Sequence, residues 1–120
     1  MDAASGAVTT AHGLGVIPKR IRITGLAGSS SATKGRGGYS FGTYDGTNNR
    51  SIWQLTGVDF GCQNENSTTY IVKLSNDDDN NDYQTAVATF DATNITLTWT
   101  RTGSDGGGIT GQILWEAEGY

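Results

Sequence analysis

The sequence predicts an all-β fold: a single-domain antiparallel β-sandwich, jelly-roll-like, with about eight strands. Short runs in which apolar and polar residues alternate recur along the whole chain, which is the two-residue period of a strand. Clusters rich in glycine and asparagine separate these runs, as turns do. No stretch places apolar residues at the spacing of an amphipathic helix.

The composition describes one ordinary domain. Its 120 residues suffice for a real core, and we divide them into an N-terminal arm, residues 1–8, and a sandwich domain, residues 9–120. The net charge of −4 argues against nucleic acid as the main partner, because phosphate binding needs a basic surface. The single cysteine, Cys62, excludes an internal disulfide and is interpreted as a packing or surface residue. No apolar run suits a membrane span and no secretory signal is recognised, so we expect no membrane partner.

In the first half of the chain, strands are expected at residues 7–12, 16–24, 39–43 and 50–56. Residues 25–38 hold small polar side chains and are expected to form a long exposed loop, a kind of segment that often binds a partner. Ile52 and Leu55 have opposite parities, which predicts cover on both sides of their strand or a contact between subunits.

In the second half, strands are expected at residues 69–74 and 83–90, and residues 58–67 are expected to be irregular. Two further alternating runs follow, residues 95–100 and 109–117, each with a tryptophan on its apolar face. The glycine-rich residues 103–108 between them predict a long antiparallel hairpin, which we expect to form the centre of the core.

An acidic loop is the sharpest chemical feature of the chain. Carboxylates and amide oxygens of this kind are the ligands that Ca²⁺ prefers, although the spacing is not that of an EF-hand. A solvated turn is the preferred interpretation and a calcium site is the alternative, so no cofactor is expected. The candidate metal ligands are Asp77, Asp78, Asp79 and Asp82.

The sequence shows no catalytic arrangement. His12 is the one histidine, and no nucleophile or orienting carboxylate accompanies it in a recognisable motif. Five of the eight basic residues lie near the N-terminus, where they form solvated faces or meet an acidic partner surface. The expected partner-binding residues are Met1, Asp2, Val8, Lys19, Arg20, Arg22, Lys34 and Arg36.

Three segments resemble small virion structural proteins of tailed bacteriophages. Residues 9–21 contain a His-Gly-Leu-Gly turn and a strand led by Pro-Lys, residues 39–46 end in Gly-Thr-Tyr-Asp-Gly, and residues 95–119 close the chain with Trp99 and Trp115. The closing pattern is also similar to the last strands of H-type lectin-like β-sandwiches. The resemblance implies a β-sandwich of the decoration or fibre type, without a catalytic residue or a set of sugar ligands to carry over.

These observations predict a non-enzymatic capsid decoration or cement protein on the surface of a phage particle. It would stabilise the head by non-covalent contacts with the major capsid protein or another virion protein, and we expect a homotrimer. The alternative is a receptor- or glycan-binding tip of a tail fibre or head spike, in which loop aromatics and amides would contact a sugar.

Overall fold

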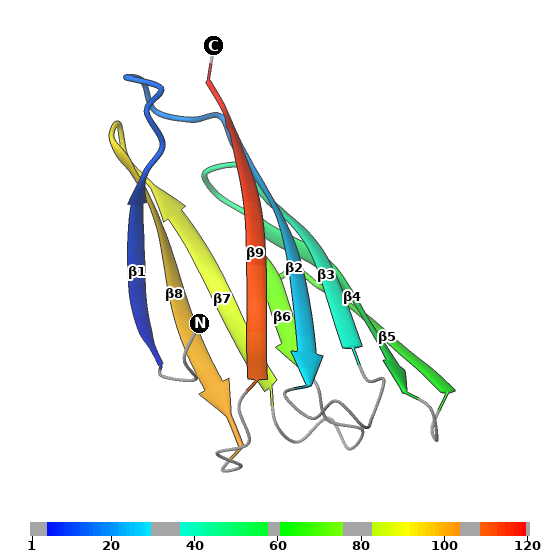
Figure 1. Cartoon of the computed structure of the whole chain (residues 1–120). Coiled ribbons are helices and arrows are strands. Elements are labelled where there is room, and N and C mark those ends of the chain that lie inside the picture. Colours follow the sequence, from blue (N-terminus) through cyan, green and yellow to red (C-terminus); the bar gives the residue numbers. More distant parts are fainter. Residues whose placement is uncertain (1–4, 30–36, 58–60, 76–82, 104–108, 120) are drawn as a thin grey trace.

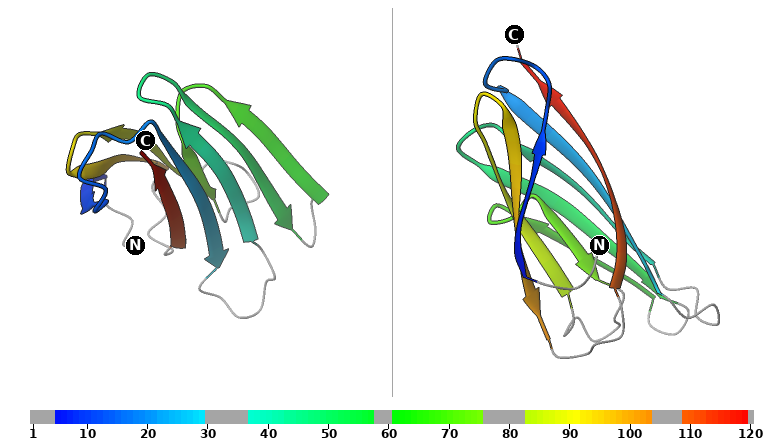
Figure 2. Two further views of the ribbon diagram at one scale, coloured as in Figure 1. Left: turned by 90° about the horizontal axis from the view of Figure 1, so that it is seen from above. Right: turned by 60° about the vertical axis from the view of Figure 1, so that its left-hand side comes forward.

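The computed structural model describes residues 5–29, 37–57, 61–75, 83–103 and 109–119. They form two antiparallel sheets packed as layers, so the predicted all-β sandwich is confirmed (Figures 1 and 2). None of these residues belongs to a helix suited to crossing a membrane. The strands are β1 (Gly6–Ala11), β2 (Arg20–Ser29), β3 (Gly37–Tyr44), β4 (Asn49–Gly57), β5 (Gly61–Ser67), β6 (Val72–Ser75), β7 (Tyr83–Phe90), β8 (Asn94–Thr102) and β9 (Ile109–Glu118).

The four-stranded sheet has the order β1-β8-β7-β6, and the five-stranded sheet has the order β5-β4-β3-β2-β9. Strands β2 to β5 follow one another as a meander, as do β6 to β8. The chain changes sheet after β1, after β5 and after β8. The first and last strands therefore lie in different sheets, and β1 and β9 are both edges (Figure 1).

The predicted C-terminal hairpin is wrong. β8 pairs with β1 and β7, whereas β9 pairs with β2 in the opposite sheet. Hairpins favour connections of two to five residues, and the segment from Thr102 to Ile109 is long enough to cross between layers. The apolar faces of both strands still point into the space between the sheets, where Ile95 and Leu97 of β8 line the same cavity as Ile113 and Trp115 of β9.

The core lies between the sheets, where the alternating residues of both layers interdigitate. Trp99 is 3% exposed, and β2 and β8 bury every second side chain, as the alternation predicts. The buried side chains form one cluster, and half-buried side chains of β9 and of the last residues of β3 and β7 pack against it. The buried cluster consists of Ile21, Ile23, Ala27, Ile71, Val72, Leu74, Ala86, Ala88, Ile95, Leu97 and Trp99.

Two segments expected to lack regular structure are strands. The predicted loop 25–38 overlaps the end of β2 and the start of β3, because Gly25 and Ala27 continue the buried face of β2. A Cβ on Gly25 would lie 2.8 Å from Val72 Cγ2, so the small residue permits close packing of the sheets. Most of the predicted irregular segment 58–67 is β5, an edge strand without apolar alternation that pairs with β4.

The second predicted strand begins later than expected. β2 starts at Arg20, and Val16 to Pro18 belong to the connection that precedes it. β1 starts at Gly6, so the sheet includes the last residues of the segment predicted as an arm.

Candidate docking surfaces

β1 is a sheet edge that its own domain leaves uncovered. All six of its residues are exposed, and it is held by its ladder with β8. Val8 lies opposite Leu97 and faces inward, yet it is 43% exposed. A strand exposed on both faces gains little from burial, so its order depends on backbone hydrogen bonds and on whatever covers it.

The sandwich is open between its edges β1 and β9. A cavity of about 170 Å³ separates them, and it is mainly apolar. Trp115 is only half-buried, and its side of the cavity lies across from Val8 and Thr10 of β1. The lining residues are Val8, Thr10, Ile95, Leu97, Ile113 and Trp115.

β1 runs into a turn that His12 and two glycines shape. The Leu14 amide donates to His12 Nδ1 at 3.2 Å, so Nε2 carries the ring proton and donates to the Asp91 carbonyl at 3.1 Å. Gly13 and Gly15 have φ values of 71° and 69°, the left-handed region that glycine adopts without strain. Both nitrogens of His12 thus bond main-chain atoms and hold the turn in place.

This turn presents three apolar side chains to solvent. Leu14, Val16 and Ile17 are 38%, 50% and 61% exposed. Gly119 packs beneath them, since a Cβ there would lie 2.9 Å from Val16 Cγ2. Residues 6–17, which we call the N-terminal segment, therefore combine an uncovered edge strand with an apolar turn, the kind of surface that marks an interaction site.

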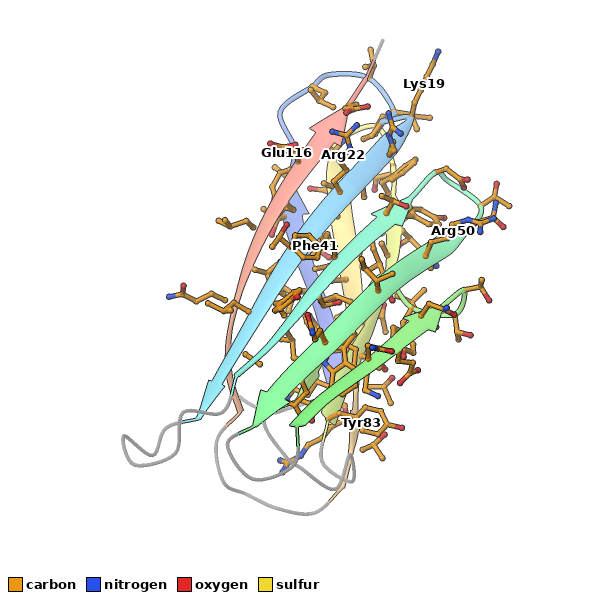
Figure 3. The ribbon with its side chains drawn as sticks, turned by 90° about the vertical axis from the view of Figure 1, so that its right-hand side faces the viewer. Lys19, Arg22, Phe41, Arg50, Tyr83 and Glu116 are labelled. Atoms are coloured by element: carbon orange, nitrogen blue, oxygen red, sulfur yellow. The ribbon has the colours of Figure 1, made fainter. Side chains whose placement is uncertain are left out.

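The predicted basic residues are partly engaged within the chain. Arg20 and Arg22 both contact the Glu118 carboxylate, through nitrogen–oxygen distances of 2.8 and 3.0 Å. The hydrogen bond from Arg20, followed by the charges of both arginines, holds the pKa of Glu118 below its ordinary value. Lys19 is exposed immediately before this strand (Figure 3). Met1, Asp2, Lys34 and Arg36 lie outside the described residues.

A second uncovered surface is the outward side of the five-stranded sheet. Five large apolar side chains project from it, and Leu114 and Ile52 are the most exposed at 76% and 59%. Tyr39 and Phe41 are neighbours on β3, with ring centroids 5.6 Å apart at an edge-to-face angle of 73°. Among the described side chains, the apolar set is Leu26, Tyr39, Phe41, Ile52 and Leu114.

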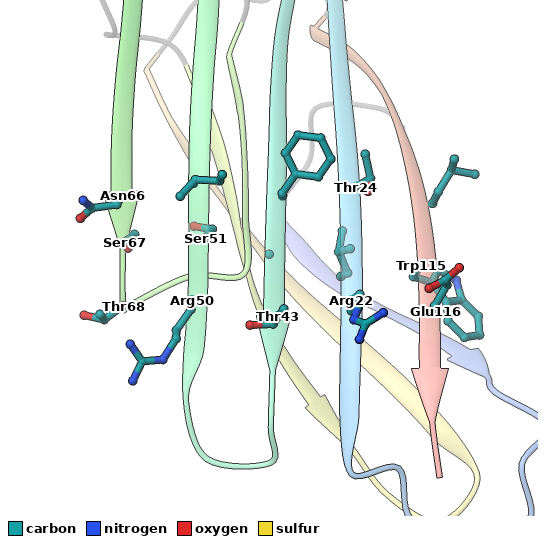
Figure 4. A pocket seen from close by; sticks show the side chains of 15 residues that line it. Arg22, Thr24, Thr43, Arg50, Ser51, Asn66, Ser67, Thr68, Trp115 and Glu116 are labelled. Carbon is teal, nitrogen blue, oxygen red and sulfur yellow. The ribbon is translucent and has the colours of Figure 1, made fainter.

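This outward side is hollowed over β9, β2, β3 and β4. The hollow measures about 670 Å³, and Thr24, Phe41 and Leu114 are among its lining residues (Figure 4). Arg22, Arg50 and Glu116 lie at one end of it. An apolar floor with a few charged and polar groups is typical of a binding surface. A second hollow of about 300 Å³ continues from it past Tyr39, Gln54 and Asn64.

A buried lysine closes the side of the sandwich formed by β5 and β6, opposite the open edge between β1 and β9. Lys73 is 3% exposed, and its ammonium lies 2.7 Å from Glu65 Oε2 and 4.3 Å and 4.5 Å from the ring centres of Trp53 and Tyr83. Glu65 also accepts a hydrogen bond from Tyr70. The hydrogen bond from Lys73 is the main cause of a lowered pKa at Glu65, and burial raises the pKa of Tyr70. Every charged group here has a partner inside the cluster, so its role is structural.

No group of three or more potential metal ligands occurs among the described residues. The four aspartates of the predicted calcium alternative lie in residues 76–82, outside the described part of the chain. Cys62 lies in β5, and its side chain is likewise outside the described part.

A scan of protein-family models finds no match to this chain, and searches of curated proteins and of solved structures find none either.

Of the predicted partner-binding residues, Val8 lies in the N-terminal segment and Arg20 and Arg22 lie together on β2. The apolar turn was not among the expected contact residues, whereas for the outward side of the five-stranded sheet a contact between subunits was one of two interpretations. The signal for the latter was the opposite parity of Ile52 and Leu55, which indicated that β4 carries apolar side chains on both faces.

Proposed function

We propose that the chain is a structural protein of a bacteriophage virion, a capsid decoration or cement protein that stabilises the head by non-covalent contacts. The observation that carries the proposal is the N-terminal segment, an edge strand exposed on both faces that leads into an apolar turn. The resemblance of residues 9–21 to small tailed-phage virion proteins supports the virion as the setting.

In this proposal the N-terminal segment lies against the major capsid protein or another virion protein. Val8, Val16 and Ile17 are about half exposed, so burying the rest of each contributes about half of the roughly 1.5–3 kcal/mol that full burial is worth, before the cost of association is subtracted. The free backbone edge of β1 offers further hydrogen bonds to an added strand. A symmetric oligomer would multiply these contacts, and the homotrimer expected from the sequence stays a prediction.

Two substitutions in the turn test the proposal. Val16→Asp and Ile17→Asp, combined in one variant, place two carboxylates on the proposed contact without disturbing the core, since both residues are at least half exposed. We expect the variant to lose cosedimentation with particles of the phage that encodes the chain, because burying unpaired charge is costly. Deleting residues 1–8 is expected to abolish attachment in the same way while the domain stays folded.

Val87→Asp is the control. Val87 is 40% exposed on β7, which lies in the same sheet as β1 but is separated from it by β8, and the substitution adds one carboxylate outside the N-terminal segment. The control is expected to cosediment as the wild type does. Attachment by the Val16→Asp, Ile17→Asp variant at the wild-type level would refute the assignment of the contact.

The alternative role, a receptor- or glycan-binding tip, finds its support at the second hollow. Tyr39, Gln54 and Asn64 line it, so an aromatic ring adjoins amides that can bond sugar hydroxyls. Glycan-array binding that Tyr39→Ala removes would favour this role, and an array without signal for the wild-type chain would reject it.

A further inference from the structure

The outward residues of the five-stranded sheet form a regular lattice. Backbone register aligns the side chains of β9, β2, β3 and β4 in three rows, each read here in that strand order. The first row is Glu116, Arg22, Thr43, Arg50; the second is Leu114, Thr24, Phe41, Ile52; the third is Gln112, Leu26, Tyr39, Gln54. We call these twelve residues the outer face.

Each row is complementary to the same row read in the opposite strand order. The third row reads amide, apolar, apolar, amide in either direction. In the second row the two ends are aliphatic, and the two middle positions are a small residue and a large ring. In the first row Glu116 stands at one end and Arg50 at the other. A surface that matches its own reverse is the requirement for an isologous contact between two identical chains.

We propose that the outer face binds the outer face of a second copy of this chain. The two-fold axis lies parallel to the strands and midway between β2 and β3. It places β9 over β4 of the second copy and β2 over β3 of the second copy. Each contact then occurs twice, and the proposal is independent of the virion assignment.

The charges support this arrangement. Arg50 and Glu116 are exposed, and neither forms an ion pair with another described residue. They are three strands apart, about 14 Å across the sheet, so they do not reach each other within one chain. The two-fold axis brings each of them opposite its counter-charge on the second copy, which fixes register and disfavours other alignments.

The same axis avoids a like-charge clash. Arg22 lies opposite Thr43 of the second copy, and its guanidinium already contacts Glu118 of its own chain at 3.0 Å. Shifting the axis onto β3 would instead bring Arg22 over Arg50 of the second copy. The position between β2 and β3 is therefore the favourable one.

The hollow supplies the steric complement. Thr24 is the small residue of the second row and lies between Leu114 and Phe41 in the register. The two-fold axis places the ring of Phe41 from the second copy over Thr24, where the hollow of about 670 Å³ receives it (Figure 4). Leu114 then meets Ile52 of the second copy, and Leu26 meets Tyr39 of the second copy, so apolar area is buried against apolar area.

A partner of another kind would not require this symmetry. A surface that binds an unlike protein or a glycan is matched to that partner. Nothing then requires its residues, taken across the strands in one direction, to complement the same residues taken in the other direction. The lattice measures roughly 20 by 20 Å, from strand and row spacings of about 4.8 and 6.8 Å, which is a small interface. We therefore expect association that depends on concentration in the micromolar range.

Charge reversal tests the proposal with the full chain. Sedimentation equilibrium from about 1 to about 200 µM is expected to show the wild-type mass doubling with concentration. Glu116→Arg alone places two arginine pairs in the contact, and Arg50→Glu alone places two glutamate pairs there. Each variant alone is expected to associate at least about tenfold more weakly than the wild type.

Two further samples identify the partner as a second copy. An equimolar mixture of the Glu116→Arg chain and the Arg50→Glu chain restores both opposite-charge pairs, so the mixture is expected to dimerise. The double variant Glu116→Arg, Arg50→Glu is expected to dimerise with itself. Circular dichroism of each variant checks that these exposed substitutions leave the fold intact.

A wild-type chain whose mass does not double over this range overturns the proposal, whether or not it retains a glycan or another protein on this face. Reversals that leave the association unchanged overturn it as well, as does a mixture that fails to dimerise. If the predicted homotrimer also forms, the two-fold contact joins two trimers, and each single reversal is then expected to halve the observed mass.

Discussion

At the scale of single residues, Gly42 is the described glycine with the least room for a side chain. It faces inward from β3, and a Cβ there would lie 1.6 Å from the carbonyl oxygen of Ile71. Main-chain atoms cannot move aside as a flexible side chain does. The close approach of β3 to Ile71, just before β6, therefore requires a residue without a Cβ at position 42.

We predict that Gly42→Ala lowers the free energy of unfolding by more than about 3 kcal/mol or prevents folding. Thr43→Ala is the control, because Thr43 is the next residue on β3 and faces outward. It is expected to change stability by less than about 1 kcal/mol. Urea unfolding of both variants, followed by tryptophan fluorescence, gives the comparison, and equal stabilities would contradict the packing described here.

Lys73 and Glu65 form a pair in which one partner is buried. We predict that Glu65→Gln destabilises the fold by about 1–3 kcal/mol, because it removes the counter-charge of the buried ammonium and leaves a neutral amide oxygen and the two aromatic rings as its neighbours. Lys73→Met is the informative counterpart. It removes the buried charge and leaves Glu65 at a side-chain exposure of 40%, so it is expected to cost less than Glu65→Gln. Thermal unfolding of the two variants tests that order.

The same pair predicts an acid dependence. The pKa of Glu65 in the folded chain is lowered, chiefly by the hydrogen bond from Lys73. The ionised carboxylate therefore contributes to stability above the unfolded-state pKa of about 4.3, and this contribution is lost as pH falls through the folded-state pKa. Stability is therefore expected to drop on acidification below about pH 4. Urea titrations at about pH 5 and about pH 3 measure the free energy of unfolding at each pH. The loss of stability between the two pH values should be smaller for Glu65→Gln than for the wild type, and an equal loss would show that Glu65 is not its cause.

Sequence reasoning could not find this cluster. Lys73 occupies a position of β6 between two core residues, Val72 and Leu74, where alternation predicts a solvated side chain. Its burial results from rings and a carboxylate contributed by β4, β5 and β7, and pairing between distant strands leaves no local pattern. Trp53 and Tyr83, by contrast, were recognisable as strand residues although their contact with a lysine was not.

At the scale of elements, alternation predicted where strands occur better than it predicted their neighbours. Residues 95–100 and 109–117 were correctly expected to be strands with an apolar face each, but they lie in opposite sheets instead of one hairpin. Periodicity determines the two faces of a strand and carries no information on which strand lies beside it. β5 escaped notice because an edge strand with polar residues on both faces has no apolar alternation.

The same limit explains why the sequence did not show that the rings of β3 join Ile52 on the outer face. Periodicity places Tyr39 and Phe41 on one side of β3 without saying which side is inside. Gly38, Ser40 and Gly42 occupy the inner side, where the backbone of residues 71–75 approaches closely and Ser40 accepts the Lys73 amide at 3.1 Å. The small residues are inside because the sheets are close there, and the rings are left outside.

β1 is expected to be the least protected strand of the isolated chain. Its six residues are exposed, whereas β2 buries every second side chain and pairs on both edges. Hydrogen exchange followed by mass spectrometry should show faster exchange across Gly6–Ala11 than across residues 20–27. Slowing of that exchange when the chain is added to particles would accompany docking, and equal protection of the two strands in the free chain would contradict the exposed-edge description.

At the scale of the whole molecule, the two candidate surfaces lie on different parts of the sandwich and serve different contacts. The N-terminal segment flanks the open edge between β1 and β9, and the outer face is the outward side of β9, β2, β3 and β4. One surface can therefore bind a virion protein while the other binds a second copy. This arrangement would let a small domain form a continuous layer on a larger particle.

The sandwich itself followed from the sequence, because alternation and the absence of helical spacing are properties of the whole chain. The inward residues of β2 and β8 were expected from the same alternation. The contact surfaces are properties of the assembled sheets, and only the position of Val8 and the two parities of β4 hinted at them.

The most direct test of the proposed role is an electron cryo-microscopy map of the particle to which the chain binds. We predict that the shell protein, or another virion protein, lies within contact distance of Val8, Leu14, Val16 and Ile17. A map in which these four side chains face solvent while a different surface meets the shell would contradict it.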